Sequence, residues 1–155
     1  MNIGDASKEI LIEAQKEHRL ICGLNSVTKY LKETENLEHS LFFFMAPSPA
    51  GDCLAHMQEV FLQAFCLESD IYVIKLDNAE KLNKILGSKR CDTCALVQRS
   101  STKSLKNLDD EIDLDQFTDI ENILIDNCEE FWSEPVQPII RLPEKWNKFL
   151  RNLGI

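Results

Sequence analysis

Residues 61–86 read FLQAFCLESDIYVIKLDNAEKLNKIL, and the predicted fold is built outward from them. Up to Ser69 the apolar residues recur at helical spacing. Residues 71–74 (IYVI) then form an unbroken β-branched and aromatic run, which is typical of a strand covered on both faces. Asn78 is suited to cap a second helix, which Gly87 ends. The pattern therefore predicts a helix, a buried strand and another helix in succession.

The helix that leads into this segment has two apolar faces. Gly51 breaks any structure before it, and Asp52 is suited to be its N-cap. One face carries Leu54, Met57, Phe61, Ala64 and Phe65, and the second carries Cys53, Val60 and Leu67. A helix that covers a single surface needs only one apolar stripe. Two interpretations follow: the helix is enclosed within its own domain, or one face covers the sheet and the other meets another chain.

The other predicted elements alternate around this core. They are a helix from Asp5 to Gly23, a shorter helix capped by Asn25 or Ser26, strands at 41–45 and 94–97, a helix opened by the capping box of Thr118 and Glu121, and an edge strand at 136–142 that contains Pro138. This order predicts a three-layer α/β/α sandwich with a central mixed sheet over residues 1–144. Residues 99–116 are predicted to be a mobile acidic loop within it, and 145–155 an extra C-terminal amphipathic helix.

Composition sets limits on the function. A length of 155 residues with 44% hydrophobic and 28% charged residues predicts one soluble globular domain. No apolar run reaches the length of a membrane span, so we expect no membrane insertion. The formal net charge of -9 disfavours nucleic acid and favours basic protein partners. The N-terminus lacks a secretory-signal pattern, so the six cysteines are expected to be reduced thiols inside a cell.

Charge is unevenly distributed near the C-terminus. No Lys or Arg occurs between Leu108 and Ile140, and one short segment concentrates the acids Asp109, Asp110, Glu111, Asp113 and Asp115. Such a run forms either a solvated face or an electrostatic landing site for a basic peptide. The segment after Pro143 has an apolar face and a basic face with Lys145, Lys148 and Arg151. It either docks on its own domain or meets a partner.

Enzymatic and metal sites have little support. Cys53, His56, Cys91 and Cys94 together could supply four zinc ligands, but their spacing matches no known finger, and small core residues explain them equally well. Whether Cys91 and Cys94 pair stays open. The three histidines lack a recognisable triad motif, and no Gly-rich phosphate loop is present. We therefore expect no enzyme activity, no metal and no cofactor.

Four short motifs carry a family resemblance. They are residues 4–6 (GDA), 63–66 (QAFC), 68–71 (ESDI) and 140–144 (IRLPE). In this order and spacing they resemble the growth-arrest-and-DNA-damage-inducible stress proteins. The resemblance implies the fold of the kink-turn-binding ribosomal proteins. It implies a non-enzymatic acidic adaptor of growth arrest, cell-cycle control and apoptosis, in nucleus and cytoplasm. Its partners would be a stress-activated MAP kinase kinase kinase, the proliferating-cell nuclear antigen, and a cyclin-dependent kinase and its inhibitor.

The resemblance also suggests interaction residues. A homodimer built through the matching helices predicts an interface of Val27, Tyr30, Leu31, Cys53, Val60, Ala64 and Leu67. The acidic partner site would comprise Asp52, Glu68, Asp70, Asp109, Asp110, Glu111, Asp113 and Asp115. In the family, the loop before the central helix is strongly acidic, whereas residues 47–52 here contain one acid, Asp52. Whether the acids at 109–115 replace that loop stays open, and residues 145–155 have no counterpart to supply a role.

RNA binding is the alternative. Kink-turn binders open their second helix with Gly-x-Asn-Glu-x-x-Lys, in which Asn and Glu reach exposed base edges. Gly23, Asn25 and Lys29 match this segment, but Ser26 stands at the Glu position. Helix termination by Gly and capping by Asn explain the same residues without RNA. The acidic balance also opposes phosphate contacts, so nucleic acid is the weaker prediction.

Overall fold

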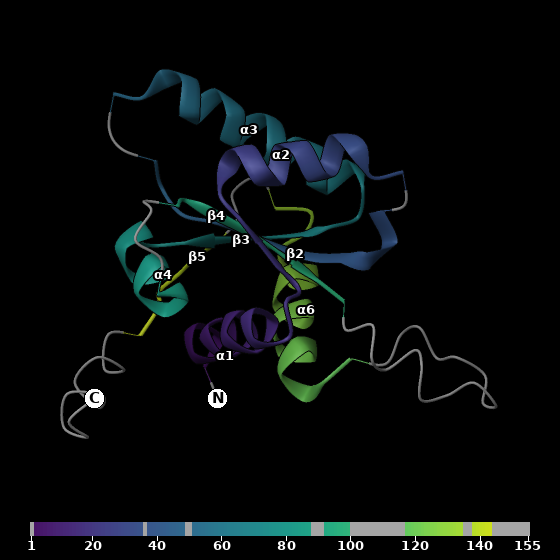
Figure 1. The fold of residues 1–155 in the computed structure, drawn as a ribbon. Coiled ribbons are helices and arrows are strands. Elements are labelled where there is room, and N and C mark those ends of the chain that lie inside the picture. The colour runs from purple at the N-terminus through teal and green to yellow at the C-terminus, as the bar shows by residue number, and fades with distance from the viewer. Residues whose placement is uncertain are drawn as a thin grey trace.

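The computed structural model describes residues 2–35, 37–48, 51–87, 92–99, 117–134 and 138–143. The elements follow in the order α1 (Ile3–Lys16), β1 (Leu20–Cys22), α2 (Leu24–Glu33), η1 (Leu37–His39), β2 (Ser40–Met45), α3 (Cys53–Glu68), β3 (Tyr72–Leu76), α4 (Ala79–Leu86), β4 (Cys94–Gln98), α6 (Asp119–Glu130) and β5 (Ile139–Ile140) (Figure 1). The strands form one sheet in the order β1-β4-β2-β3-β5.

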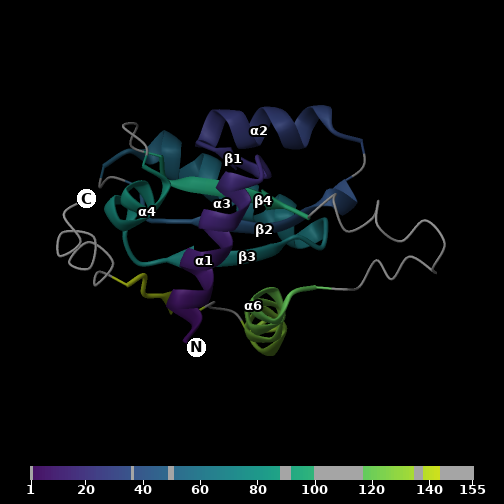
Figure 2. The same ribbon diagram turned by 60° about the horizontal axis from the view of Figure 1, so that its bottom comes forward.

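The sheet is mixed and lies between two layers of helices. Strands β2, β3 and β5 run parallel to one another, whereas β4 runs antiparallel to both of its neighbours, β1 and β2. Helices α2 and α3 cover one face, and α1, α4 and α6 cover the other (Figure 1). Figure 2 shows α1 and α6 from their own side of the sheet. The predicted three-layer α/β/α sandwich is confirmed.

The core is divided between the two faces of the sheet. Successive side chains of a strand point to opposite faces, so β2 sends Phe42 and Phe44 toward α1 and Phe43 toward α2 and α3. All three phenylalanines are fully buried. This explains why residues 41–45 read as an unbroken apolar run.

Most local signals of the sequence are confirmed. The Asp52 side chain caps α3, and the Asn78 side chain caps α4. Gly87 ends α4 in the left-handed conformation with a φ of 64°. The Thr118 hydroxyl and the Glu121 carboxylate form the predicted capping box at the start of α6. These side chains satisfy backbone N–H groups that a helix leaves without partners at its N-terminus.

The predictions for residues 5–26 are partly wrong. Helix α1 ends at Lys16 instead of Gly23, and Asn2, not Asp5, is its N-cap. Strand β1, which is three residues long and pairs with β4, is not among the predicted elements. Gly23 is the N-cap of α2, with no side-chain cap, so neither Asn25 nor Ser26 has that role. A short edge strand is set by pairing with a distant segment, which helical periodicity does not register.

At the C-terminal end of the domain, β5 is a short edge strand that begins directly after Pro138. Its edge position is the one predicted from the missing N–H of Pro138. The strand was predicted over 136–142, but 139–140 is the part that forms it within the described residues. The predicted mobile loop, apart from Arg99, and the predicted helix at 145–155 lie outside the described residues.

Gly4 joins the start of α1 to the chain that follows β5. A Cβ atom at Gly4 would collide with the backbone carbonyl oxygen of Arg141. Gly-to-Ala changes inside helices usually stabilise. Here we expect Gly4→Ala to lower the free energy of unfolding by about 1–3 kcal/mol, because the two backbones must separate. Urea denaturation measures the loss.

The control for this prediction is Glu13→Ala, at an exposed position of the same helix. It should change stability by no more than about 0.5 kcal/mol. Unchanged or increased stability of Gly4→Ala would show that the first turn of α1 does not pack against the backbone at Arg141.

Candidate functional site

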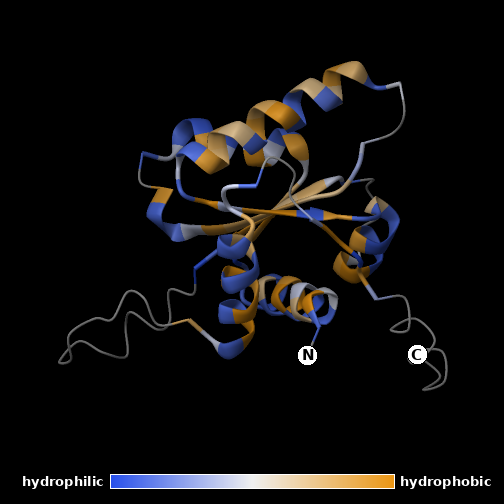
Figure 3. Ribbon diagram, turned by 180° about the vertical axis from the view of Figure 1, so that it is seen from behind, coloured by the Kyte–Doolittle hydropathy of each residue, from blue (hydrophilic) through white to orange (hydrophobic). Residues whose placement is uncertain are grey.

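Helix α3 lies on the outside of the molecule (Figure 1) and carries most of the exposed large apolar side chains among the described residues. It buries Glu59, Leu62 and Cys66 toward the sheet. The exposed large apolar side chains of the described residues are Leu54 (69%), Met57 (68%), Val60 (53%), Phe61 (63%), Trp132 (38%) and Ile139 (67%). Four of these six belong to α3, which is largely hydrophobic in Figure 3. We call Leu54, Met57, Val60 and Phe61 the α3 ridge.

The α3 ridge decides between the two interpretations of the helix. An enclosed helix would bury both apolar faces, so that interpretation is wrong. Soluble monomers rarely expose contiguous large apolar side chains, and such patches mark interaction surfaces. Beside the ridge, α2 and α3 border a groove of about 270 Å³ lined by Thr28, Lys32, Leu54, Met57, Gln58, Phe61 and Leu62. The ridge and this α2–α3 groove form one candidate protein-binding surface.

The structure divides the predicted dimer residues into three groups. Cys53, Val60 and Ala64 are exposed on α3, while Tyr30 and Leu67 are half-buried against the core. Val27 and Leu31 are buried in the core beneath α2, so their placement on an interaction surface was wrong. Leu54, Met57 and Phe61 are exposed but are not among the predicted dimer residues. Hydropathy places them on an apolar stripe but does not say whether the chain's own sheet or another chain covers it.

The described members of the predicted acidic partner site lie at opposite ends of α3. Asp52 lies at the start of α3, and Glu68 and Asp70 lie at its end. A helix of 16 residues separates the two ends by about 24 Å. All three acids are exposed. The remaining predicted members, Asp109, Asp110, Glu111, Asp113 and Asp115, lie outside the described residues.

The alternative RNA-binding residues lie at the start of α2. Gly23 is the N-cap with a φ of 94°, and Asn25 and Lys29 are exposed one helical turn apart. They therefore share one side of the helix. The Asp92 carboxylate lies close enough to Gly23 that a Cβ there would be 3.2 Å from its Oδ1. A carboxylate at this position opposes a phosphate ligand.

The cysteines of the described residues are free thiols, and most are buried. Burial raises the pKa of Cys22 to about 11 and that of Cys66, Cys94 and Cys128 to about 12. A thiol with such a pKa is protonated and unreactive at neutral pH. Among the described residues no three His, Cys, Asp or Glu side chains converge on one point that could hold a metal ion, and Cys91 lies outside them.

A second hollow lies beneath the other flank of α3, around Glu59. It has a volume of about 360 Å³ and is lined by Met45, Ala46, Pro47, Ser48, His56, Glu59, Val60, Gln63, Lys75, Leu76 and Ile139. We call it the Glu59 cavity. Glu59 is 5% exposed, and within the described part of the chain its Oε1 has no hydrogen-bond partner. Burial raises the pKa of Glu59, and side-chain hydrogen bonds with Ser48 and Thr93 partly offset this.

The raised pKa of Glu59 makes a prediction for stability. A carboxyl group whose pKa is higher in the folded state binds protons more tightly there, so its charged form destabilises the fold at neutral pH. We expect Glu59→Gln to raise the free energy of unfolding at pH 7 by about 1 kcal/mol. This is the order of the cost of a buried polar group that lacks a hydrogen-bond partner. The advantage should shrink as the pH falls through the folded pKa and vanish below the unfolded one. Urea denaturation at several pH values measures it.

The control for Glu59→Gln is Glu13→Gln, because Glu13 is exposed. It should leave stability unchanged across the same pH range. The opposite result would be a Glu59→Gln variant that is less stable than the parent by the same amount at pH 7 and at low pH. It would show that the charge of the carboxylate does not destabilise the fold.

The IRLPE motif has a structural role in this arrangement. Lys81 Nζ donates hydrogen bonds to Asp77 Oδ2 (2.8 Å) and to the carbonyl oxygen of Leu142 (3.1 Å), and the Leu142 N–H donates to Asp77 Oδ1 (3.0 Å). Although burial opposes it, the hydrogen bonds from Lys81 and Leu142 lower the pKa of Asp77. The motif is thereby fixed to α4.

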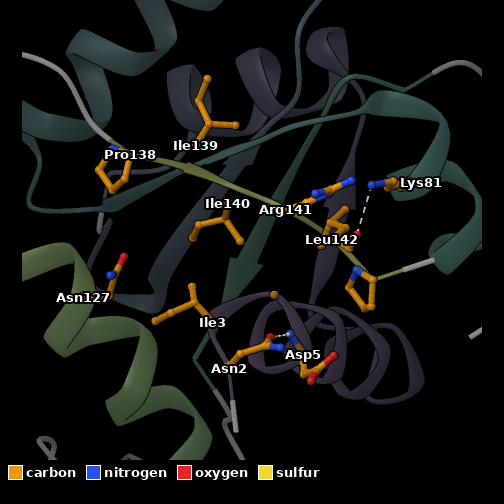
Figure 4. Close-up of a pocket in the computed structure, with 12 residues that line it drawn as sticks. Asn2, Ile3, Asp5, Lys81, Asn127, Pro138, Ile139, Ile140, Arg141 and Leu142 are labelled. Atoms are coloured by element: carbon orange, nitrogen blue, oxygen red, sulfur yellow. Dashed lines mark hydrogen bonds between the residues drawn. The ribbon is translucent and has the colours of Figure 1, made fainter. Parts of the chain in front are cut away.

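An open groove runs between this motif, the start of α1 and α6 (Figure 4). Its volume is about 730 Å³, and its lining includes Asn2, Asp5, Lys81, Asn127 and Arg141. Asn2 and Lys81 already have partners there, because Asn2 caps α1 and Lys81 binds Asp77. The groove therefore shows no convergent set of catalytic groups.

Comparison with known proteins establishes the family. The model of the Ribosomal protein L7Ae/L30e/S12e/Gadd45 family matches residues 5–107, which is more than half of the chain. The chain belongs to this family. A curated relative in it, growth arrest and DNA damage-inducible protein GADD45 gamma of Homo sapiens, is 26% identical over 85 residues. That alignment covers 55% of this chain and 54% of the relative, so the chain matches about half of the relative's length.

The match to the L7Ae/L30e/S12e/Gadd45 family covers the chain from α1 through β4. Its description names ribosomal and Gadd45 proteins and no catalytic family. It includes both RNA-binding and signalling branches, so the family alone does not choose between the two predicted functions. In the described part of the chain, no helix has the length and apolarity needed to cross a membrane.

Proposed function

We propose that the chain is a non-enzymatic, acidic adaptor of the Gadd45 type that acts as a homodimer. The observation that carries this proposal is the α3 ridge, whose four large apolar side chains are each more than half exposed. A two-fold interface uses the same patch on both subunits, so an apolar ridge beside an apolar groove is suited to self-pairing. A stable dimer buries about 800 Å² on each partner, which a helix of 16 residues and its α2 neighbour can provide.

The partner we propose is a stress-activated MAP kinase kinase kinase. Two facts support it: the similarity to a protein whose name states growth arrest and DNA damage induction, and the net charge of -9. The adaptor would bind a basic autoinhibitory segment and so shift the kinase toward its active state. The proliferating-cell nuclear antigen and a cyclin-dependent kinase with its inhibitor are further candidate partners, in nucleus and cytoplasm.

A pull-down with the noncatalytic region of such a kinase tests the proposal. The purified chain should retain the kinase region at low salt and lose it as the salt concentration rises, because exposed charges are screened. A kink-turn RNA serves as the competing ligand. Binding of the RNA without the kinase would contradict the adaptor function and select Gly23, Asn25 and Lys29 as the site.

Charge reversal in the acidic segment at 109–115 is a more specific test of the proposed kinase contact. Reversing the charge of Asp109, Asp110 and Glu111 to lysine should weaken kinase binding about tenfold or more and flatten its salt dependence, because rim charges act through long-range attraction. Affinity measured by fluorescence anisotropy at several salt concentrations checks this. An unchanged affinity and salt slope would remove these acids from the proposed interface.

A further inference from the structure

The Glu59 cavity and the α2–α3 groove lie on opposite flanks of α3, and Val60 of the α3 ridge also lines the cavity. The α2–α3 groove lies along the flank of α3 that carries Leu54 and Phe61. The Glu59 cavity lies along the flank that carries His56, Glu59 and Gln63, which are three or four residues apart and share a face. Its floor is formed where β2 and β3, two parallel strands, end. In α/β sheets the carboxyl ends of parallel strands are a preferred place for ligands.

Glu59 is only partly satisfied within the described chain, because Ser48 and Thr93 hydrogen-bond its side chain but its Oε1 has no hydrogen-bond partner. A buried carboxylate is costly unless it is paired with a cation or fully hydrogen-bonded. Glu59 is 5% exposed, and its Oε1 has no partner within the described residues. The ion pairs found there join Arg19 to Glu17 and Lys81 to Asp77. An acid left in this state on the inner face of a helix is explained by a cationic group that arrives from outside.

The shape and lining of the cavity select the kind of cation. A volume of about 360 Å³ is at the low end of the range for ligand pockets, about 300–1,000 Å³. The walls are largely apolar, with contributions from Met45, Ala46, Val60, Leu76 and Ile139. A long side chain can lay its methylene stem along such walls while its charged end reaches Glu59. A guanidinium is planar and weakly hydrated, so it loses less hydration free energy than an ammonium does when it enters a buried site.

We propose that the Glu59 cavity receives an arginine side chain carried by a protein partner. This inference rests on the proposed adaptor function and names the residue type that the partner inserts. The hydroxyl groups of Ser48 and Thr93 hold the carboxylate in place, and its free Oε1 accepts from the guanidinium. Lys75 lines the same cavity from β3, opposite Met45 and Ile139 in the sheet register. Its ammonium opposes a second cation.

Phenylguanidine is a suitable probe, and phenylurea is its uncharged counterpart of nearly the same shape. Each is titrated into the full chain while methyl NMR signals of Met45 and Ile139 are followed. Phenylguanidine should shift both signals saturably, and phenylurea should not. Glu59→Gln should weaken phenylguanidine binding at least tenfold. Glu13→Gln, which removes the same charge from an exposed site, should leave the affinity unchanged. Lys75→Met should tighten binding, because a competing cation is removed.

Several outcomes would overturn the inference. They are the absence of shifts up to the solubility limit of phenylguanidine, equal binding of phenylurea, and unchanged affinity in Glu59→Gln. Weaker binding in Lys75→Met would also contradict it, because Lys75 would then help to hold the ligand. The NMR spectrum of each variant reports directly whether the fold is retained.

The test distinguishes the cavity from the adaptor function. Kinase binding in the pull-down with no phenylguanidine binding would overturn the arginine site alone. Phenylguanidine binding that depends on Glu59, with no kinase binding, would retain a guanidinium site and overturn the proposed kinase partner. If both proposals hold, Glu59→Gln should weaken kinase binding while Glu13→Gln should not.

Discussion

Replacing Phe61 with glutamate is expected to convert the proposed dimer into a folded monomer. Phe61 is 63% exposed and borders the α2–α3 groove. Replacing its side chain should therefore cost the isolated domain little stability. In a two-fold dimer the residue occurs twice, and burial of each side chain contributes about 1.5–3 kcal/mol. Two buried carboxylates would add a further penalty. The dissociation constant should rise at least about 100-fold, which sedimentation equilibrium can measure.

The matched control is Lys16→Glu, which places glutamate at an exposed position of α1 on the other side of the sheet. It should leave the dimer intact. A parent chain that sediments as a monomer at about 100 μM would contradict the dimer proposal. An interface of standard size has a dissociation constant far below that concentration. Loss of the fold in Phe61→Glu would show that the side chain supports the core and not an interface.

Much of the architecture could be predicted because its signals are local. Asp52, Asn78 and Thr118 were recognised as N-caps from the apolar periodicity that follows them, and the structure confirms each. The buried strands were recognised as continuous apolar runs. Strand β1 was missed because its three residues become a strand through pairing with β4, some 75 positions later in the chain, as with Leu20 opposite Val97. No short-range pattern contains that information.

The candidate site was less predictable because it depends on which surfaces the domain leaves uncovered. Periodicity predicts α3 as a helix with two apolar faces. In the structure, Leu62 and Cys66 of this helix pack against the sheet, and the α3 ridge is exposed. Val27 and Leu31 were predicted at the dimer interface, but they are buried in the core. Their side chains pack α2 onto the sheet. Glu59 gave no signal at all. A glutamate in a helix is ordinarily solvated, and three-dimensional packing alone places this one over the sheet.

The two halves of the core provide a second prediction, based on two neighbours in β2. Phe43 and Phe44 are both fully buried but point to opposite faces of the sheet. Replacement of either by alanine removes a large side chain and leaves a cavity. Each change should lower the free energy of unfolding by about 3–5 kcal/mol, measured by urea denaturation. Small domains have a total stability of about 5–15 kcal/mol, so the two variants are compared at about 10–20 °C, where stability is highest.

The two variants should differ in their effect on the dimer. Phe43 packs in the cluster that also contains Leu62 and Cys66 of α3, so its loss lets α3 move relative to the sheet. Phe44 belongs to the cluster under α1 and α4, away from the proposed interface. At a temperature at which both variants are folded, sedimentation equilibrium should therefore show a weaker dimer for Phe43→Ala than for Phe44→Ala. Equal dimer affinity in the two variants would mean that the α3 ridge does not depend on the core behind it. Because the same range of stability loss is expected for both variants, each is the control for the other: a general effect of unfolding would weaken both dimers alike.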